Sequence, residues 1–273
     1  MIEIVGGGLI GLSCAWEMQS RGLDVVVYER ELSRRGSASW AGAGMLGALA
    51  ETFPSALWQE RALESARMYP EWLARLGGVV DYAEGGENFD GHVDPRDLLR
   101  ELSGKVRVEE REVGGLEELS GEQVVVCAGA WASRLGGVPE VGPVKGYLIA
   151  WDGVPPGTLK GILREGHTYI LQRQSGRVIA GSTEERIGFD AGMDEAVVGG
   201  LRERALAVWP LLREVPVAEI WYGYRPAAEG DVPVVCRRDE RVVLAYGHYR
   251  NGILLAPWTA RWVADEVARQ LGE

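Results

Sequence analysis

Apolar residues at the start of the chain follow first the pattern of a strand and then that of a helix. Residues 3–5 form an extended run that enters Gly6, Gly7 and Gly8. Apolar residues then recur at helical spacing over 9–20, at Leu9, Leu12, Ala15, Trp16 and Met18. Gly22 ends this helix, and a second apolar run over 25–28 ends at Glu29. The opening segment therefore predicts a strand, a helix and a second strand.

The pattern beyond Glu29 predicts a mixture of helices and strands whose balance shifts along the chain. Pro70 punctuates the first long helix, and Asp94 caps the next one with Pro95 at its first position. In chain order we expect a small-residue loop at 34–51, helices at about 55–76 and from 95, extended segments near 106–113 and 123–131, strand-rich runs over 144–224 with one helix at about 194–213, a buried strand at 241–248 and a terminal helix from about 253 to 272.

This order predicts an α/β protein with a Rossmann-like nucleotide-binding domain built from both ends of the chain. We expect that domain to comprise residues 1–80, 91–143 and 226–273. The strand-rich middle predicts a second, smaller, mainly antiparallel-sheet domain of α+β type, comprising residues 81–90 and 144–225, which would hold the substrate.

Charge and cysteine content narrow the function classes. With 29 Lys and Arg against 40 Asp and Glu, the net charge of −11 disfavours nucleic acid and anionic membranes as partners. Cys14, Cys127 and Cys236 are odd in number and lie in apolar surroundings, which predicts buried thiols in a reducing compartment. No CxxC pair or Cys/His cluster suggests a metal. We find no signal-peptide pattern and no apolar run approaching 18 residues, so we expect a cytoplasmic protein.

The glycines after the first strand carry the first chemical signal. Gly6, Gly8 and Gly11 form a GxGxxG motif, in which the first permits a tight turn, the second lets backbone approach a pyrophosphate and the third lets helix pack on strand. Glu29 ends the second strand, where a carboxylate accepts hydrogen bonds from an adenosine ribose and disfavours a 2′-phosphate. The pattern predicts a dinucleotide site, and by itself leaves FAD and NAD open.

Three later motifs bear on that choice, and each has a structural alternative. The strand before Ala128 and Gly129 ends in small residues that suit either close approach to a cofactor or a plain turn. Arg225 offers a planar fork for a carboxylate, or a surface salt bridge. Residues 248–251 precede a helix beginning near Ile253, whose N-terminus can stabilise negative charge on a flavin, or simply form a capped turn.

Together, the motifs VGGGLIG, Glu29, AGAGML, VVVCAGAW, GYRP and GHYRNGILLAP resemble the D-amino acid oxidase superfamily of FAD enzymes. The resemblance spans nearly the whole chain and looks closest to the glycine oxidases, flavoenzymes associated with making the thiazole part of thiamine. GHYRNGILLAP is its most specific part, whereas the other motifs are shared more widely.

The resemblance implies FAD as cofactor and assigns residues to it. FAD contacts would come from Leu9, Ile10, Glu29, Arg30, Ala38, Ser39, Ala43, Gly44, Met45, Val113, His248, Tyr249, Arg250, Asn251, Gly252, Ile253 and Leu254. The substrate carboxylate would be held by Arg225, with Arg250 as the second active-site arginine. Tyr169 and His167 match side chains that line the substrate pocket.

Two departures from the superfamily pattern bear on the substrate. Family members are longer, and the residues missing here fall between Tyr82 and Gly91, in the first part of the substrate domain. Glu184 stands in GSTEE where glycine oxidases typically have an apolar residue facing the substrate. Its carboxylate would either attract a second amine or cationic side chain, or point to solvent.

The implied reaction is oxidative deamination of glycine or another small amino acid, either a D-amino acid or an N-alkylglycine. The substrate loses hydride to the flavin, and water hydrolyses the resulting imine to an oxo acid and ammonia, with hydrogen peroxide formed if oxygen is the acceptor. Alternatives are a dehydrogenase with another acceptor, or a flavin-binding protein with reduced turnover. A homo-oligomer stays open, because ten tryptophans suit an interface or a core equally well.

Overall fold

A parallel sheet forms one half of the molecule in the computed structural model, which describes residues 1–86 and 90–272. Residues 87–89, within the predicted segment 81–90, and residue 273 lie outside the described residues. The sheet runs in the order β13 (Val234–Arg237), β14 (Val242–Tyr246), β7 (Gln123–Val126), β1 (Ile2–Val5), β2 (Val25–Glu29) and β6 (Val108–Glu110). Every pairing is parallel except β13 with β14. Strands from both ends of the chain share this sheet.

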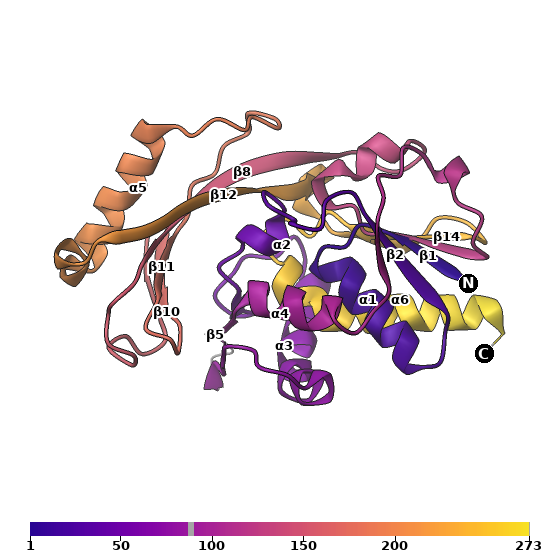
Figure 1. Ribbon diagram of the computed structural model, residues 1–273, viewed down its shortest axis with the longest axis horizontal. Coiled ribbons are helices and arrows are strands. Elements are labelled where there is room, and N and C mark those ends of the chain that lie inside the picture. The colour runs from indigo at the N-terminus through magenta and orange to yellow at the C-terminus, as the bar shows by residue number, and fades with distance from the viewer. Residues whose placement is uncertain (87–89, 273) are drawn as a thin grey trace.

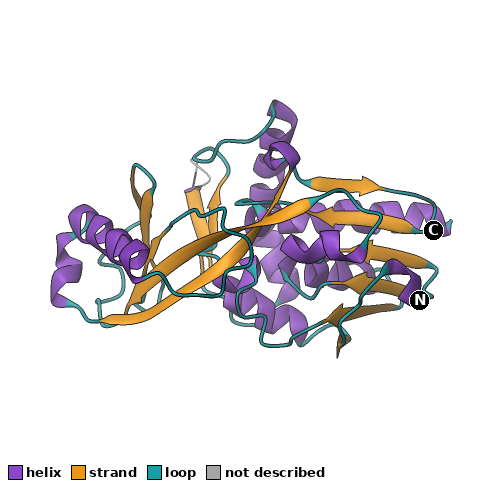
Figure 2. Cartoon of the chain, turned by 90° about the horizontal axis from the view of Figure 1, so that it is seen from above, coloured by secondary structure: helices purple, strands orange, loops and turns teal. Residues whose placement is uncertain are grey.

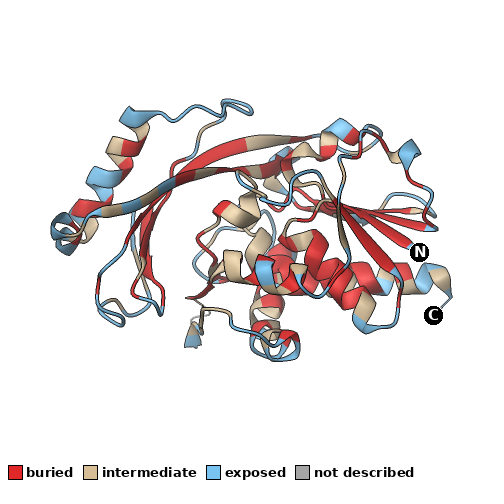
Figure 3. Cartoon of the chain, in the orientation of Figure 1, coloured by how far each residue is buried: buried red, intermediate tan, exposed pale blue. Residues whose placement is uncertain are grey.

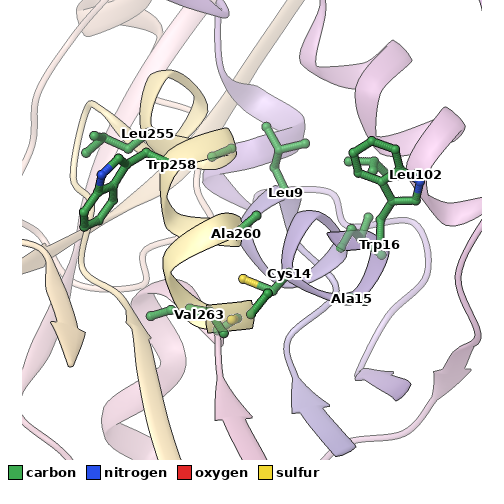
Figure 4. Close-up of a cluster of buried hydrophobic side chains, with 14 of the residues drawn as sticks. Leu9, Cys14, Ala15, Trp16, Leu102, Leu255, Trp258, Ala260 and Val263 are labelled. Atoms are coloured by element: carbon green, nitrogen blue, oxygen red, sulfur yellow. The ribbon is translucent and has the colours of Figure 1, made fainter. Parts of the chain in front are cut away.

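Four helices accompany this sheet (Figure 1), and all four contribute side chains to its main core. These helices are α1 (Leu9–Ser20), α3 (Ala56–Leu76), α4 (Pro95–Ser103) and α6 (Gly252–Leu271). Leu9 and Cys14 of α1 lie beside Ala260 and Val263 of α6 in this core (Figure 4). α1 is buried along most of its length, so it is apolar on nearly all sides. The predicted helices at 9–20 and 55–76 are confirmed.

An antiparallel sheet forms the other half (Figure 2). Its order is β12 (Val217–Ala228), β8 (Val141–Trp151), β11 (Val178–Gly181), β10 (Thr168–Gln172) and β9 (Ile162–Glu165). The long pair β8 and β12 spans both halves as a two-stranded ribbon, and α5 (Glu195–Val208) packs on the far end of the sheet. The predicted α/β class, with a parallel Rossmann-like sheet and an antiparallel sheet, is confirmed.

A short helix, a small sheet and several 3-10 turns complete the chain. They are α2 (Ala38–Ala41), the three-stranded sheet of β3 (Met45–Gly47), β5 (Asp90–Val93) and β4 (Tyr82–Ala83), and 3-10 turns at Leu116–Glu118, Gly129–Leu135, Pro210–Glu214 and Glu229–Asp231. β4 pairs with β5 and β5 with β3, so this sheet joins residues from both sides of the predicted boundary at 80/81. That boundary stays a prediction.

Three details differ from the sequence expectations. The helix expected at 194–213 ends at Val208, because Pro210 lacks the amide hydrogen needed to continue it, and a 3-10 turn follows. The run expected to be extended over 123–131 leaves the sheet after Val126 and turns at Gly129. Cys236 is exposed on the edge strand β13, whereas Cys14 and Cys127 are buried as predicted.

The strands of both large sheets are mostly buried (Figure 3), and a buried arginine joins the two halves of the molecule. Arg173, directly after β10, is 2% exposed and donates from Nη2 to the carbonyl oxygen of Ala43 at 2.6 Å. Its Nη1 lies 3.0 Å from Nδ1 of His92, and its Nε lies 3.5 Å from the carboxylate of Asp94, which also caps α4. Burial and the Arg173 charge lower the pKa of His92 to about 4, so this imidazole is neutral in the folded chain.

This cluster predicts a loss of stability in mild acid. Between pH 6.5 and about 4 the unfolded chain protonates His92 while the folded chain does not, so the free energy of unfolding falls as pH falls, by up to about 3 kcal/mol for this residue. His92→Gln should flatten that part of the profile, measured by urea unfolding at several pH values. Exposed His167→Gln is the control, and an equal slope in both variants would remove His92 as the cause.

Candidate functional site

A cavity of about 420 Å³ lies where the two halves of the molecule meet. Its walls come from the β1–α1 turn, the ends of β2 and β7, the loop around α2, the ribbon β8–β12 and the β14–α6 loop. β1, β2, β7 and β14 are parallel, so their carboxyl ends open on the same edge. This edge is where open α/β sheets bind their ligands.

The β1–α1 turn is built from glycines whose backbone lies so close to neighbouring backbone that a side chain would not fit. Gly6 has φ +105°, and a Cβ there would lie 2.5 Å from the carbonyl oxygen of Cys127. A Cβ on Gly11 would lie 1.9 Å from the carbonyl oxygen of Gly6, so helix and strand approach closely only with glycine. Gly8 caps α1 without a side-chain hydrogen bond, and the first turn holds no acidic residue. The positive end of α1 therefore suits a phosphate.

Glu29 ends β2 at the cavity wall, as its place in the sequence predicts. One carboxylate oxygen accepts the backbone N–H of Gly7 at 2.8 Å, and the other accepts that of Glu31 at 3.1 Å. These bonds fix the carboxylate next to the glycine turn while leaving lone pairs for a ribose hydroxyl. The geometry suits the adenosine half of a dinucleotide.

Arg34 is a site residue that sequence reasoning missed. Its Nε donates to the carbonyl oxygen of Gly7 at 2.6 Å and its Nη1 to that of Leu32 at 3.1 Å, whereas Nη2 is buried without a partner. Burial lowers the pKa of this guanidinium. Among the described residues, Arg34 has no ion pair, and neither have three further arginines of the cavity wall: Arg30, Arg35 and Arg134. The Arg34-Arg35 doublet after Glu29 was the available signal for an anion site.

The β14–α6 loop builds another wall of the cavity. Buried His248 lies 3.0 Å from the hydroxyl of Thr259, and burial lowers its pKa to about 3, so it is neutral. Tyr249 has φ +49° and donates its N–H to Pro226, which ties the loop to β12. α6 begins at Gly252 after Asn251, whose side chain makes no capping bond. The N-terminal amides of α6 thus open toward the cavity.

Arg225 on β12 places an uncompensated cation in the cavity wall. Its Nη1 donates to the carbonyl oxygen of Thr183 at 3.1 Å and its Nη2 to the hydroxyl of Ser182 at 2.8 Å. Among the described residues no carboxylate forms an ion pair with it, and burial lowers its pKa. Gly146 makes room for the group, since a Cβ there would lie 2.2 Å from Arg225 Nη1. Ser182 and Gly146 carried no sequence signal.

The remaining candidate side chains separate into those at the cavity and those away from it. Buried Tyr169 lines it, and burial raises the pKa of its hydroxyl, which the charges of Arg225 and Arg250 partly offset. Arg250 also lines it and pairs with Glu51, a wall residue that sequence reasoning missed, at 3.4 Å. His167 corrects our expectation: it is exposed in the turn between β9 and β10, outside the cavity wall.

Most residues assigned to the cofactor come together here. The wall includes Gly6, Gly8, Leu9, Ile10, Glu29, Arg30, Ala38, Ser39, Ala43, Gly44, Met45, Val113, Ala128, Gly129, His248, Tyr249, Arg250, Asn251, Gly252 and Ile253. Gly11 and Leu254 lie behind it, because they face the packing between helix and sheet. Glu184 lies outside the wall and is exposed, with its carboxylate 3.8 Å from Arg250.

Comparison with known proteins shows which protein family has this fold and this kind of site. The family model described as "FAD dependent oxidoreductase" matches residues 2–89 and 81–266, nearly the whole chain. The chain belongs to this family of FAD-dependent oxidoreductases. The two matched segments overlap at 81–89, within the region where this chain is expected to lack residues that longer family members have.

Glycine oxidases and ThiO proteins are its homologues within that family. The chain is 30% identical over 346 residues to the bifunctional protein ThiO/ThiG of Nostoc sp., covering 98% of this chain and 53% of that protein. It is 29% identical to the glycine oxidase of Geobacillus kaustophilus, covering 98% and 93%. The chain thus spans about half the length of the bifunctional relatives it matches.

Solved structures show the same fold. The crystal structure of glycine oxidase from Geobacillus kaustophilus superposes with a TM-score of 0.85 at 27% identity, covering 98% of this chain and 94% of that one. Iminodiacetate oxidase from Chelativorans sp. BNC1 superposes with a TM-score of 0.83 at 20% identity, covering 100% and 96%, which is a likeness of fold. In the described part of this chain, no helix is long and apolar enough to cross a membrane, and no cluster of side chains suits a metal ion.

Arg34 yields a test of cofactor binding. If its unpartnered Nη2 faces the pyrophosphate, Arg34→Met should weaken FAD binding at least about tenfold and reduce its salt dependence, because a charge-assisted hydrogen bond is lost. Titration of apoprotein with FAD, followed by quenching of flavin fluorescence at two salt concentrations, measures both. Arg202→Met on the exposed face of α5 is the control, and equal affinities in the two variants would place Arg34 outside the site.

Proposed function

We propose that this protein catalyses the FAD-dependent oxidation of glycine or another small amino acid, a D-amino acid or an N-alkylglycine, to an imine that water hydrolyses to an oxo acid and ammonia. The observation that carries the proposal is Arg225: a half-buried guanidinium in the cavity wall that forms no ion pair with a carboxylate of the described residues. Such a cation favours a counter-charge, and an amino acid's carboxylate supplies one.

The cavity wall fits FAD along its length. The glycine turn, the N-terminus of α1 and Arg34 suit the pyrophosphate, and Glu29 suits the adenosine ribose. The N-terminus of α6, led by Asn251, suits the electron-rich edge of a flavin ring. When bound, FAD supplies the acceptor for hydride from the α-carbon of the substrate.

The contribution of the chain's own residues is orientation. Arg225 binds the carboxylate through the N–H groups that Ser182 and Thr183 leave unused, and those two partners hold the guanidinium in one position. The Tyr169 hydroxyl lies among the same charges, and its raised pKa keeps it protonated as a hydrogen-bond donor. His248 is neutral and bonded to Thr259, so it holds the loop in place and carries no charge to the substrate.

The electron acceptor and the pathway belong to the same proposal. We take oxygen as acceptor, with hydrogen peroxide as product, because the chain's homologues include glycine oxidases. A role in making the thiazole of thiamine is supported by the likeness to proteins called ThiO/ThiG. A dehydrogenase using another acceptor is the alternative, and oxygen consumption during turnover distinguishes the two.

Arg225 gives the decisive experiment. Anaerobic addition of glycine, sarcosine or a panel of D-amino acids should bleach the flavin absorption bands of the wild-type holoenzyme. Arg225→Met should retain FAD and lose at least about 100-fold in kcat/KM, because the substrate carboxylate is left without its partner. His167→Ala, outside the cavity, should keep wild-type kinetics. A holoenzyme that none of these compounds reduces, or an Arg225→Met variant with unchanged kinetics, would contradict the proposal.

A further inference from the structure

Two carboxylates bracket Arg250 at the rim of the cavity. Arg250 Nε lies 3.4 Å from Glu51 Oε2, and its Nη1 lies 3.8 Å from Glu184 Oε2. Both Arg225 and Arg250 line the same cavity, yet Arg225 has no such partner in the described part of the chain. One guanidinium is therefore free to take a substrate carboxylate, whereas the other is already compensated.

Glu51 and Glu184 together carry more negative charge than Arg250 carries positive charge. Against the single positive charge of Arg250 they leave one negative charge in excess at the rim. Arg186, which lies 6.0 Å from the Tyr249 ring, pairs with Asp231 at 3.6 Å instead. The rim near Arg250 is thus anionic, while the wall at Arg225 is cationic. A ligand with opposite charges at its two ends matches this polarity.

Glu184 is the source of the excess. Glu51 is the closer partner of Arg250, and its side chain is only 18% exposed. The positive charge of Arg250 therefore neutralises mainly the carboxylate of Glu51. Glu184 is more distant and 45% exposed, and it also lies next to the Tyr249 hydroxyl, whose pKa rises to about 12 from burial and from this carboxylate. Burial lowers the pKa of Arg225 in the cavity wall, and the charge of Glu184 partly offsets that effect.

We propose that Glu184 makes this cavity select amino acids by the charge of the group that lies opposite their carboxylate. A cationic substituent is favoured and a second carboxylate is disfavoured, so the preferred substrates are small amino acids whose side chain or N-substituent carries an amine. The inference rests on the proposed function, since it takes Arg225 as the seat of the α-carboxylate. Of the two roles that the sequence left open for Glu184, it takes the attraction of an amine, exerted from the rim outside the cavity wall.

Three straight-chain acids test this selection without any turnover. Valerate, 4-aminobutyrate and glutarate share a carboxylate and three methylenes and differ in their far end, which is a methyl, an ammonium or a carboxylate group. Their dissociation constants are measured from the change they cause in the flavin absorption of the holoenzyme. We expect 4-aminobutyrate to bind about fivefold more tightly than valerate, and valerate about fivefold more tightly than glutarate, the range for a partly exposed charge.

The variant Glu184→Gln removes the charge and keeps the shape. In this variant the affinities for 4-aminobutyrate and glutarate should each lie within about twofold of the affinity for valerate. Compared with the wild type, glutarate should bind more tightly and 4-aminobutyrate more weakly. Glu203→Gln, on the exposed part of α5, changes the net charge equally and should retain the wild-type ratios. Raising the salt concentration should shrink the wild-type ratios in the same direction as Glu184→Gln.

The outcomes separate this inference from the proposed function. Equal affinities for the three acids, or ratios that Glu184→Gln leaves unchanged, would overturn the selection by charge while glycine or sarcosine still reduces the flavin. Absence of binding by all three acids would overturn it as well. If, in addition, no amino acid reduces the flavin, the assignment of Arg225 falls with it.

Discussion

The close approach of backbone at the carboxyl edge of the parallel sheet is the constraint on which the rest of the structure depends. Gly6 sits against the carbonyl of Cys127, and Gly11 sits against the carbonyl of Gly6, so β1, β7 and α1 meet with no side chain between them. That contact aims the N-terminus of α1 at the cavity and leaves space for a phosphate. Substitution by any larger residue would separate strand from helix and close the site.

The ribbon β8–β12 converts that edge into an enclosed site. It begins beside the parallel sheet and carries Arg225 and Gly146 across the cavity before joining the antiparallel sheet. Arg173 also connects the two halves, because it joins the end of β10 to the backbone of Ala43 and to Asp94, which caps α4. The two halves are therefore held by polar contacts buried beside the cavity, which keeps the candidate cofactor wall and the candidate substrate wall in register.

The charges of the wall divide into two regions with different tasks. Arg30, Arg34, Arg35 and Arg134 line the cavity without an ion-pair partner among the described residues, and Arg34 bonds the glycine turn, which favours an anionic cofactor there. Arg225 and Arg250 form the other region, in which Glu51 of the wall and Glu184 outside it pair with Arg250, and only Arg225 lacks a partner among the described residues. Uncompensated charge in a buried wall indicates where a ligand of opposite charge belongs.

The sequence by itself determined the parts of this protein that depend on neighbouring residues. Helical spacing, the glycine motif and the terminal acid of β2 predicted α1, the parallel sheet and the place of Glu29, because local backbone preferences and side-chain periodicity act over a few residues. Only the tertiary structure decided which distant groups meet. It paired Arg250 with Glu51, oriented Arg225 through Ser182, brought Arg34 to the glycine turn and left His167 in solvent. Such contacts join residues far apart in the chain, and their distances are set by how sheets and helices pack, which no local pattern encodes.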